Sequence, residues 1–365
     1  MKKCTQIDKV RSTIKNFSQI DKVRTYKKAR SATKNLSSTI KNFSPIDKPV
    51  VSILLAVYKP NEAWFIEQLI SLNEQTYDNI ELLIYDDCPD YPVNEDYFKK
   101  YITNFSYTLR RGIKNEGSNK AFEELTKQGT GELFSYCDQD DIWEKEKIAL
   151  MVEKFKEKDV TLVFSDLSII DENSKTIANS ITDIRKRLKT KCGYNLTKEL
   201  LISNFVTGCA MMVKSNIAKK AMPFEQTLLH DQWIAIVAST SGKLEFINRT
   251  LVRYRQHNSN QTGILQGIYD KKTYYNIKIQ DILERFISYQ NRLSYNDELN
   301  KLINYCLISL MARKNYFLKP SFKQLKIMIK YSDFYKVSIL LEIFLPIIPR
   351  FIFKYIIELT KKGVL

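Results

Sequence analysis

Short apolar runs alternate with amphipathic segments between Val50 and Ser165, and this alternation limits the chain to one class of fold. The continuous apolar run at residues 50–58 is typical of a strand that is covered on both faces. We expect further strands at residues 80–85, 107–109, 133–137 and 161–165, and helices at 61–75, 119–127 and 144–157. Strands that alternate with helices predict an α/β fold whose mixed, mostly parallel sheet is flanked by helices.

An acidic cluster, Asp138-Gln139-Asp140-Asp141, follows the apolar run at residues 133–137. Three carboxylates in four residues repel one another, and burial at the end of a strand increases that cost. A hard divalent cation with oxygen ligands would offset the charge. The alternative is a helix start, with Asp140 or Asp141 as the N-cap residue. The cluster alone leaves both interpretations open.

Other polar residues also follow predicted strands. Tyr58 comes after the first strand, and Asp86-Asp87 comes after the second. In open α/β sheets, ligands bind outside the carboxyl ends of the strands. The sequence therefore predicts one ligand site at this edge of the sheet. For Asp86-Asp87 the alternative is turn chemistry before Pro89.

The positive charge is concentrated at the N-terminus. Residues 1–48 hold ten Lys and three Arg against three Asp, which is +10 of the formal net charge of +16. This arm repeats with a period of 13 residues, beginning at Thr5, Ser18 and Ser31. Each repeat is too short and too polar to bury a core, so we expect a disordered or surface-bound arm. Attraction to nucleic acid or acidic lipid is the functional alternative, although no interleaved aromatic residues support base stacking.

Cysteine usage favours a reducing compartment. The six cysteines are scattered and form no CxxC pair, so neither a zinc site nor a redox motif is indicated. In a chain of this length the pattern suggests reduced thiols in the cytosol. The first thirty residues have no apolar core segment of the kind found in signal peptides, so we expect none.

The sequence changes character after Gly263, where helical segments rich in Tyr and Ile extend to Lys330. Residues 337–357 are strongly apolar, but Glu342, Pro346, Pro349, Arg350 and Lys354 interrupt them. A helix that spans a bilayer needs about 20 mostly apolar residues, which this segment does not provide. Two interpretations remain for this segment. It is either an element lying in the membrane surface, or a helix packed on the preceding domain or on a partner subunit.

Several motifs together resemble family 2 inverting glycosyltransferases of the GT-A fold. They are residues 51–90, the Asn115-Glu116-Gly117 element and the segment FSYCDQDDIWEKEKI at 134–148. The DQDDIW form is similar to a bacterial subgroup of rhamnosyltransferases for O-antigen and cell-wall polysaccharides. Residues 204–213, 229–247 and 253–263 agree with that subgroup. Cys88-Pro89 and Gln232 depart from the family pattern, near the nucleoside and the acceptor respectively.

The resemblance extends over about residues 49–263. It implies a GT-A domain at 49–263, and the arm at 1–48 and the helical region at 264–365, with its possible membrane-surface segment at 337–357, lie outside it. It implies a dTDP- or UDP-sugar donor and Mg²⁺ or Mn²⁺ held by Asp138, Asp140 and His257. An exposed loop histidine is the alternative for His257. The implied donor contacts are Ala56, Val57, Tyr58, Asp86, Asp87, Asn115, Lys120, Asp138, Gln139, Arg253 and Arg255.

The resemblance also assigns the acceptor side. Inversion requires a base opposite the leaving group, and we expect Asp231 in His230-Asp231-Gln232-Trp233 to serve. A helix N-cap is the alternative for Asp231. The implied acceptor residues are Asp141, Trp143, Gly208, His230 and Trp233.

The expected function is sugar transfer, with L-rhamnose from dTDP-rhamnose as one candidate, to a surface-polysaccharide acceptor on a lipid carrier. A UDP-hexose donor is the alternative within this class. An inactive membrane-associated binding module is the alternative from another class. We expect the protein in the cytoplasm, peripheral at the inner face of a bacterial plasma membrane. Nucleic acid is not an expected partner, and the sequence predicts no oligomeric state.

Overall fold

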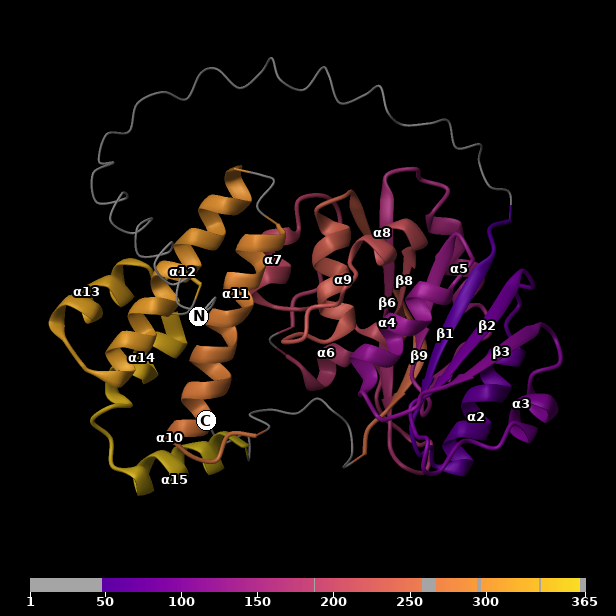
Figure 1. Ribbon diagram of the computed structural model, residues 1–365, viewed down its shortest axis with the longest axis horizontal. Helices are drawn as coiled ribbons and strands as arrows, with labels where there is room; N and C mark the ends of the chain where they lie inside the picture. The colour runs from indigo at the N-terminus through magenta and orange to yellow at the C-terminus, as the bar shows by residue number, and fades with distance from the viewer. Residues whose placement is uncertain (1–47, 187, 258–266, 294–296, 335, 362–365) are drawn as a thin grey trace, which may run out of the picture.

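The computed structural model describes residues 48–186, 188–257, 267–293, 297–334 and 336–361. The predicted arm, apart from Lys48, lies outside the described residues. Figure 1 shows two neighbouring parts, a sheet with its covering helices on the right and a group of helices, α10 to α15, on the left. Strand β9 ends at Arg255 and α10 begins at Lys271, whereas the predicted boundary at residues 263–264 lies outside the described residues.

One mixed sheet forms the first part. Its first half is parallel, in the order β3 (Ser106–Arg111), β2 (Ile80–Asp86), β1 (Val51–Val57) and β4 (Leu133–Cys137). Its second half continues through β8 (Met211–Lys214), β6 (Val160–Ile170), β9 (Lys243–Arg255) and the short β5 (Ile142–Trp143), with β7 (Thr176–Ala178) paired to β6. Strand β8 is antiparallel to both of its neighbours, whereas β6 and β9 run parallel. The predicted α/β class and mixed sheet are confirmed.

Helices cover both faces of the sheet, as the apolar strands require. Within β1, Ile53 and Leu55 belong to one buried cluster and Leu54 belongs to the other. The first part contains α2 (Glu62–Asn73), α3 (Asp96–Tyr101), α4 (Ser118–Gln128), α5 (Lys147–Lys154), α6 (Ile181–Ile184), α7 (Thr197–Ile202), α8 (Ser215–Lys220) and α9 (His230–Ser239). The Asn61 side chain caps α2 by accepting from the amides of Ala63 and Trp64.

The second part is entirely helical among its described residues. It contains α10 (Lys271–Tyr275), a π-helical turn (Asn276–Gln280), α11 (Asp281–Arg292), α12 (Asp297–Leu318), α13 (Phe322–Lys330), α14 (Lys336–Phe344) and α15 (Arg350–Lys361). Helix α11 docks on the first part, where the Tyr289 ring stacks on Trp233 with centroids 6.0 Å apart. The Arg292 guanidinium donates to the carbonyls of Ala221 and Pro223. The two parts therefore share a core.

The apolar segment at 337–357 is divided between two helices. Helix α14 ends at Phe344 and α15 begins at Arg350, with both prolines lying between them. Inside α14, Glu342 is buried and its carboxylate accepts from Arg313 at 2.6 Å and from Tyr274 at 3.0 Å. Among the described residues, no helix combines the length and apolar character that crossing a bilayer would require.

Candidate functional site

The acidic cluster lies directly after β4, at the carboxyl end of the strand, as the sequence predicted. Asp141 is fully buried, and its Oδ1 atom accepts from the backbone amide of Arg255 at 3.0 Å. Its Oδ2 atom is buried without a hydrogen-bond partner in the described chain. Asp138 and Asp140 are only partly buried. The cluster therefore has one anchored carboxylate and two that are open to a ligand.

His257 joins this cluster from the other end of the domain. Its Nε2 atom lies 2.8 Å from Asp140 Oδ2, and its ring lies 4.9 Å from the Trp64 ring between centroids. His257 also lines an open hollow of about 540 Å³, together with Asp171, Glu172, Asn173, Ile177 and Gln256. The structure thus unites Asp140 and His257, which the sequence analysis assigned to one metal site.

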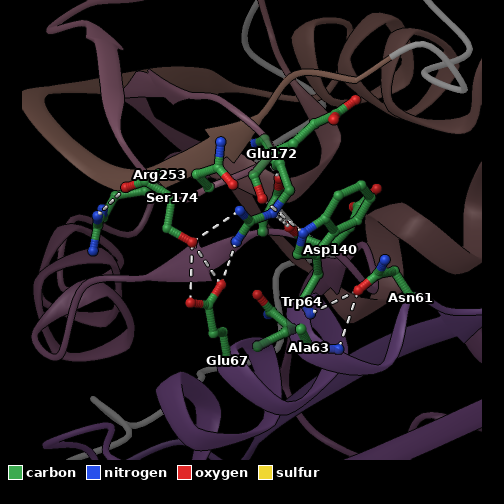
Figure 2. A network of polar contacts seen from close by, with 12 residues as sticks. Asn61, Ala63, Trp64, Glu67, Asp140, Glu172, Ser174 and Arg253 are labelled. Atoms are coloured by element: carbon green, nitrogen blue, oxygen red, sulfur yellow. Dashed lines mark hydrogen bonds and ion pairs between the residues drawn. The ribbon is translucent and has the colours of Figure 1, made fainter.

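A buried arginine holds these elements in place. The Arg255 side chain is fully buried, and its Nε atom donates to the Asp140 carbonyl at 2.8 Å. Its Nη2 atom bonds to Glu67 Oε2 at 2.5 Å, and its Nη1 atom bonds to Ser174 Oγ at 2.9 Å. Figure 2 shows Glu67 and Ser174 bonded to each other, close to Asp140 and Trp64. Arg255 therefore supports the acidic loop from inside the protein.

These contacts bear on two predicted donor contacts, Arg255 and Arg253. To bind a donor, the Arg255 guanidinium would have to be accessible. Instead it is buried, and its N–H groups donate hydrogen bonds inside the protein. Arg253 donates to the Ser174 carbonyl at 3.0 Å, so it too contacts the loop between β6 and β7. The Trp64 indole donates to the Glu172 carbonyl of the same loop at 3.0 Å. Strand β9, helix α2 and this loop are thus fastened together around the acidic cluster.

Burial and mutual repulsion make the carboxylates hold their protons tightly. Burial, followed by the charges of Asp140 and Asp231, raises the pKa of Asp138 to about 7. Burial, followed by the charges of Asp140 and Asp138, also raises the pKa of Asp141 well above its usual range. Such carboxylates are stabilised in their charged form by a cation, so the donor set fits a hard divalent metal.

One further potential ligand was not predicted. The ligand atoms of Asp138, Asp141 and Cys209 all lie within 4.8 Å of one another. Burial raises the pKa of the Cys209 thiol well above its usual range, which favours the uncharged form. Cys209 lies in the short 3₁₀ turn Gly208–Ala210, and a lone cysteine gave no signal in the sequence.

A buried lysine, also missed, lies among the same groups. Lys147 is fully buried, and its Nζ atom donates to Ser135 Oγ at 3.0 Å and lies 3.1 Å from the Trp143 ring centroid. Burial lowers the pKa of the Lys147 ammonium to about 7, although the charges of Cys137, Cys209 and Asp141 oppose the shift. The helix predicted at residues 144–157 contains several charged residues, and nothing in its sequence indicated that the Lys147 side chain would be buried.

Asp231 lies in the first turn of α9, and its carboxylate is held by two backbone amides. Oδ2 accepts from Gly208 at 3.0 Å and Oδ1 accepts from Gln232 at 2.6 Å. Burial raises the pKa of Asp231 to about 6. The N-cap position belongs to Leu229, so Asp231 is not the N-cap residue that the alternative proposed. Its charge acts on Asp138, which places the two carboxylates in one electrostatic environment.

Gly208 and His230 border Asp231. A Cβ atom on Gly208 would lie 2.9 Å from His230 Nε2 and 3.4 Å from the Asp231 Cβ atom, so the close approach requires glycine. The His230 ring is enclosed by Phe122 and Tyr136, with centroids 4.0 and 5.0 Å away. Burial lowers the pKa of His230 to about 3, which keeps the imidazole neutral.

The predicted donor residues lie in loops that the paired aspartates organise. Asp86 accepts from the amides of Cys88 and Val93, and Asp87 accepts from those of Glu116 and Gly117. The Asp86 bond to Cys88 is the local turn contact of the alternative interpretation, whereas Asp87 bonds to residues 29 and 30 positions away in the chain. Asp87 also donates its backbone amide to the Val57 carbonyl, next to Ala56 on β1. The loop that contains the exposed Asn115 is thereby held against the end of β1.

Tyr58 and Gln139 fix the other side of this region. The Gln139 amide accepts from the Tyr58 N–H at 2.7 Å and donates to the Tyr58 carbonyl at 3.0 Å. The Tyr58 side chain remains 45% exposed, which leaves its ring available to a ligand. Lys120 is paired with Glu123 at 2.7 Å and with Glu124 at 3.4 Å. Gln139 therefore acts on the loop backbone, and Lys120 already has acidic partners.

Two residues that were predicted to contact the acceptor, Trp143 and Trp233, are packed inside the protein instead. Trp143 is 2% exposed and lies in the apolar cluster on the α2 side of the sheet. Trp233 is 1% exposed, donates to the Ala221 carbonyl at 2.7 Å and stacks on Tyr289. Each indole fills apolar space against one face of the sheet. A sequence motif alone does not distinguish such packing from contact with a ligand.

Comparison with known proteins finds a family match over part of the chain. Residues 52–220 match the family described as Glycosyl transferase family 2. An uncharacterized glycosyltransferase of Nostoc sp. is 27% identical over 227 residues, covering 58% of this chain and 66% of that protein, so the chain spans just under two thirds of it. The dTDP-rhamnosyl transferase RfbG of Shigella flexneri is 28% identical over 226 residues, covering 57% and 73%.

A third relative and one solved structure complete the comparison. UDP-Glc:alpha-D-GlcNAc-diphosphoundecaprenol beta-1,3-glucosyltransferase WfgD of Escherichia coli is 28% identical over 150 residues, covering 40% of this chain and 56% of that protein. The S. aureus TarS 1-349 structure in complex with UDP-GlcNAc superposes with a TM-score of 0.52 at 15% identity, covering 78% and 80%. This likeness shows a shared fold, and the predicted GT-A class is confirmed.

Proposed function

We propose, from the premise that residues 52–220 form a glycosyltransferase family 2 domain, that this protein is a metal-dependent inverting glycosyltransferase. One observation carries the proposal. The acidic cluster after β4, His257 after β9 and Asp231 on α9 come from distant parts of the sequence, yet Asp140 contacts His257 and the charge of Asp231 acts on Asp138. A nucleotide-sugar transferase needs this combination of cation ligands and a nearby base.

Asp138, Asp140 and His257 would hold the cation, with Mg²⁺ or Mn²⁺ as the candidates. When bound, such an ion acts as a Lewis acid toward the diphosphate leaving group of the donor. Asp141 orients the loop through its bond to the Arg255 amide, and Arg255 in turn bonds the Asp140 carbonyl. These contacts fix the ligand carboxylates before any donor arrives, which reduces the cost of ordering them.

Asp231 would accept the proton of the attacking acceptor hydroxyl. With a pKa of about 6 it is largely ionised at neutral pH and more basic than an ordinary aspartate. The two amides that bond to it keep the carboxylate in one orientation. Gly208 allows His230 to lie close to Asp231, and the neutral His230, whose Nε2 atom has no hydrogen-bond partner in the described chain, would orient the acceptor.

The donor and acceptor are proposed from the relatives. The Shigella flexneri relative, a dTDP-rhamnosyl transferase, supports dTDP-rhamnose as the donor. A surface polysaccharide is the product that the motif resemblance implies. The Escherichia coli relative supports a UDP-hexose as the second candidate, and an acceptor carried on a lipid diphosphate. The exposed Tyr58 ring would border the nucleoside base, in a loop fixed by Gln139. We place the protein at the inner face of a bacterial plasma membrane, where such an acceptor would be reached.

A donor screen tests this proposal. The full chain is incubated with dTDP-rhamnose, UDP-glucose and other nucleotide sugars, and released nucleoside diphosphate is measured with and without EDTA. We expect release with one donor class that stops in EDTA and returns with excess Mn²⁺ or Mg²⁺. Release that EDTA leaves unchanged would refute metal dependence, and no release with any donor would favour an inactive binding module.

A further inference from the structure

Exposed apolar side chains follow one another in the sequence along α14, the link after it and α15. The exposed fractions are 63% for Leu340, 57% for Phe344, 73% for Ile347, 73% for Phe351, 39% for Ile352 and 62% for Tyr355. Leu340 and Phe344 are four residues apart in α14, and Phe351 and Tyr355 are four apart in α15, so each pair lies on one side of its helix. These six residues are called the apolar row below. Ile347 is exposed in the proline-containing link between the two helices.

The opposite side of the same helices is already packed. Ile339 in α14, Leu345 in the link, and Phe353 and Ile357 in α15 are each less than 5% exposed. Leu345, Phe353 and Ile357 form a cluster with Tyr274 of α10. The helices are therefore folded against the protein by one side, and the apolar row is what remains outside. An ordinary amphipathic surface helix would carry polar side chains there.

The charges around the apolar row are mostly positive. Arg350 and Lys354 on α15 are exposed, and so is Lys272 on α10. Lys271 donates to the Pro346 carbonyl at 3.5 Å and lies close enough to Arg350 for that charge to lower its pKa, after the larger effect of burial. Glu342 is buried and paired with Arg313, which leaves Glu358 on α15 and Asp270 at the start of α10 as exposed acids among the side chains described here.

We propose that the apolar row docks on the surface of an anionic lipid bilayer, with α14 and α15 lying in the plane of the interface. Apolar side chains bordered by Lys and Arg suit a surface whose interior is apolar and whose headgroups are negative. A second protein copy would bring the same positive border against itself, which disfavours it as the occupant. This inference gives the proposed membrane location a specific surface, and it does not depend on the transfer chemistry.

The position of the row suits the proposed reaction. In Figure 1, α10 and α15 lie along the lower edge of the molecule, the side toward which β1 and β9 run as they approach their carboxyl ends. The acidic cluster follows β4, which is parallel to β1. Docking through α15 would therefore bring this edge toward the bilayer, where the proposed lipid-linked acceptor would be reached.

Vesicle flotation with the full chain tests the docking. Vesicles are made of phosphatidylcholine alone or of phosphatidylcholine with phosphatidylglycerol. We expect the wild type to float with the anionic vesicles, and the Ile347→Glu/Phe351→Glu variant to bind at least about tenfold more weakly. The matched control is Phe322→Glu on α13, which is 83% exposed and outside the row, and it should bind like the wild type.

The charge requirement is tested separately, with a variant that leaves the apolar row intact. Arg350→Gln/Lys354→Gln should lose binding to anionic vesicles, whereas Lys323→Gln/Lys326→Gln, two exposed lysines on α13, should not. Wild type that stays unbound, or row and control variants that float equally, would overturn the docking. So would a concentration-dependent dimer that the row variant abolishes without any vesicle binding. Nucleoside diphosphate release without vesicles reports the proposed chemistry independently of these outcomes.

Discussion

The Asp140 carboxylate and the His257 imidazole are 117 residues apart in the chain, yet their Oδ2 and Nε2 atoms lie 2.8 Å apart. The contact exists because β9 runs parallel to β6 and its end reaches the loop that follows β4. Arg255, two residues before His257, bonds the Asp140 carbonyl and so fixes the register between strand end and loop. Two of the proposed cation ligands, Asp140 and His257, are therefore brought together by the fold rather than by local sequence.

Asp231→Asn should abolish transfer while nucleotide binding survives. The amide keeps the shape of the side chain but cannot accept the acceptor proton, so we expect a fall in kcat of about 100-fold or more. Transfer and nucleotide affinity are measured by product formation and by calorimetry. Asp96→Asn, in the first turn of α3, is the control. Parallel loss of binding and transfer would argue against the base role.

The activity should fall on the acid side of about pH 6. Burial raises the pKa of Asp231 to about 6, and only the ionised carboxylate accepts a proton. Below that pH, kcat/KM should drop by about tenfold for each pH unit. A pH profile at saturating metal, with protein folding checked at each pH, measures this. A rate that stays constant down to about pH 4.5 would contradict the assignment.

Asp138→Asn should stabilise the protein when no metal is bound. A carboxyl whose folded-state pKa is raised binds its proton more tightly in the folded chain, so stability falls as pH rises from about 4 through about 7. Removing that charge should raise the unfolding midpoint at pH 7.5 by about 2–6 °C. The gain should vanish below about pH 4, where both states are protonated.

Bound metal should make the wild type more stable than Asp138→Asn, the reverse of their order without metal. Mn²⁺ stabilises whatever it binds in the folded state, so the wild type should gain stability and Asp138→Asn should gain little. Differential scanning fluorimetry with EDTA and with Mn²⁺ measures both effects. An Asp138→Asn variant that is less stable than the wild type in EDTA would contradict the electrostatic account.

Arg255→Lys should weaken metal binding although Arg255 is not a proposed ligand. Lysine cannot reproduce the planar set of bonds to Glu67, Ser174 and the Asp140 carbonyl. We expect an affinity for Mn²⁺ that is roughly 10-fold to 100-fold lower, measured by electron paramagnetic resonance of free Mn²⁺. Arg249→Lys, whose exposed ion pair with Glu146 has little energetic weight, should leave the affinity unchanged. Equal affinities for all three proteins would show that Arg255 has no role in the site.

The sequence predicted those features that depend on residues close together in the chain. The run at 133–137 is buried on both faces in β4, and the acidic cluster follows it as expected. Trp233 was misassigned because its partner, Tyr289 of α11, lies in a segment outside the family resemblance. Arg255 was misassigned because its charge is balanced by Glu67, which is 188 residues away. Such pairings depend on the packing of distant elements, which no spacing in the sequence records.

A crystal structure of the full chain with Mn²⁺ and a nucleoside diphosphate tests the central claim most directly. We predict that the Asp140 carboxylate and His257 contact the ion, and that Asp231 faces the same cleft with Gly208 beside it. An ion bound away from Asp140, or an Asp231 carboxylate that points into a different part of the molecule, would contradict the account.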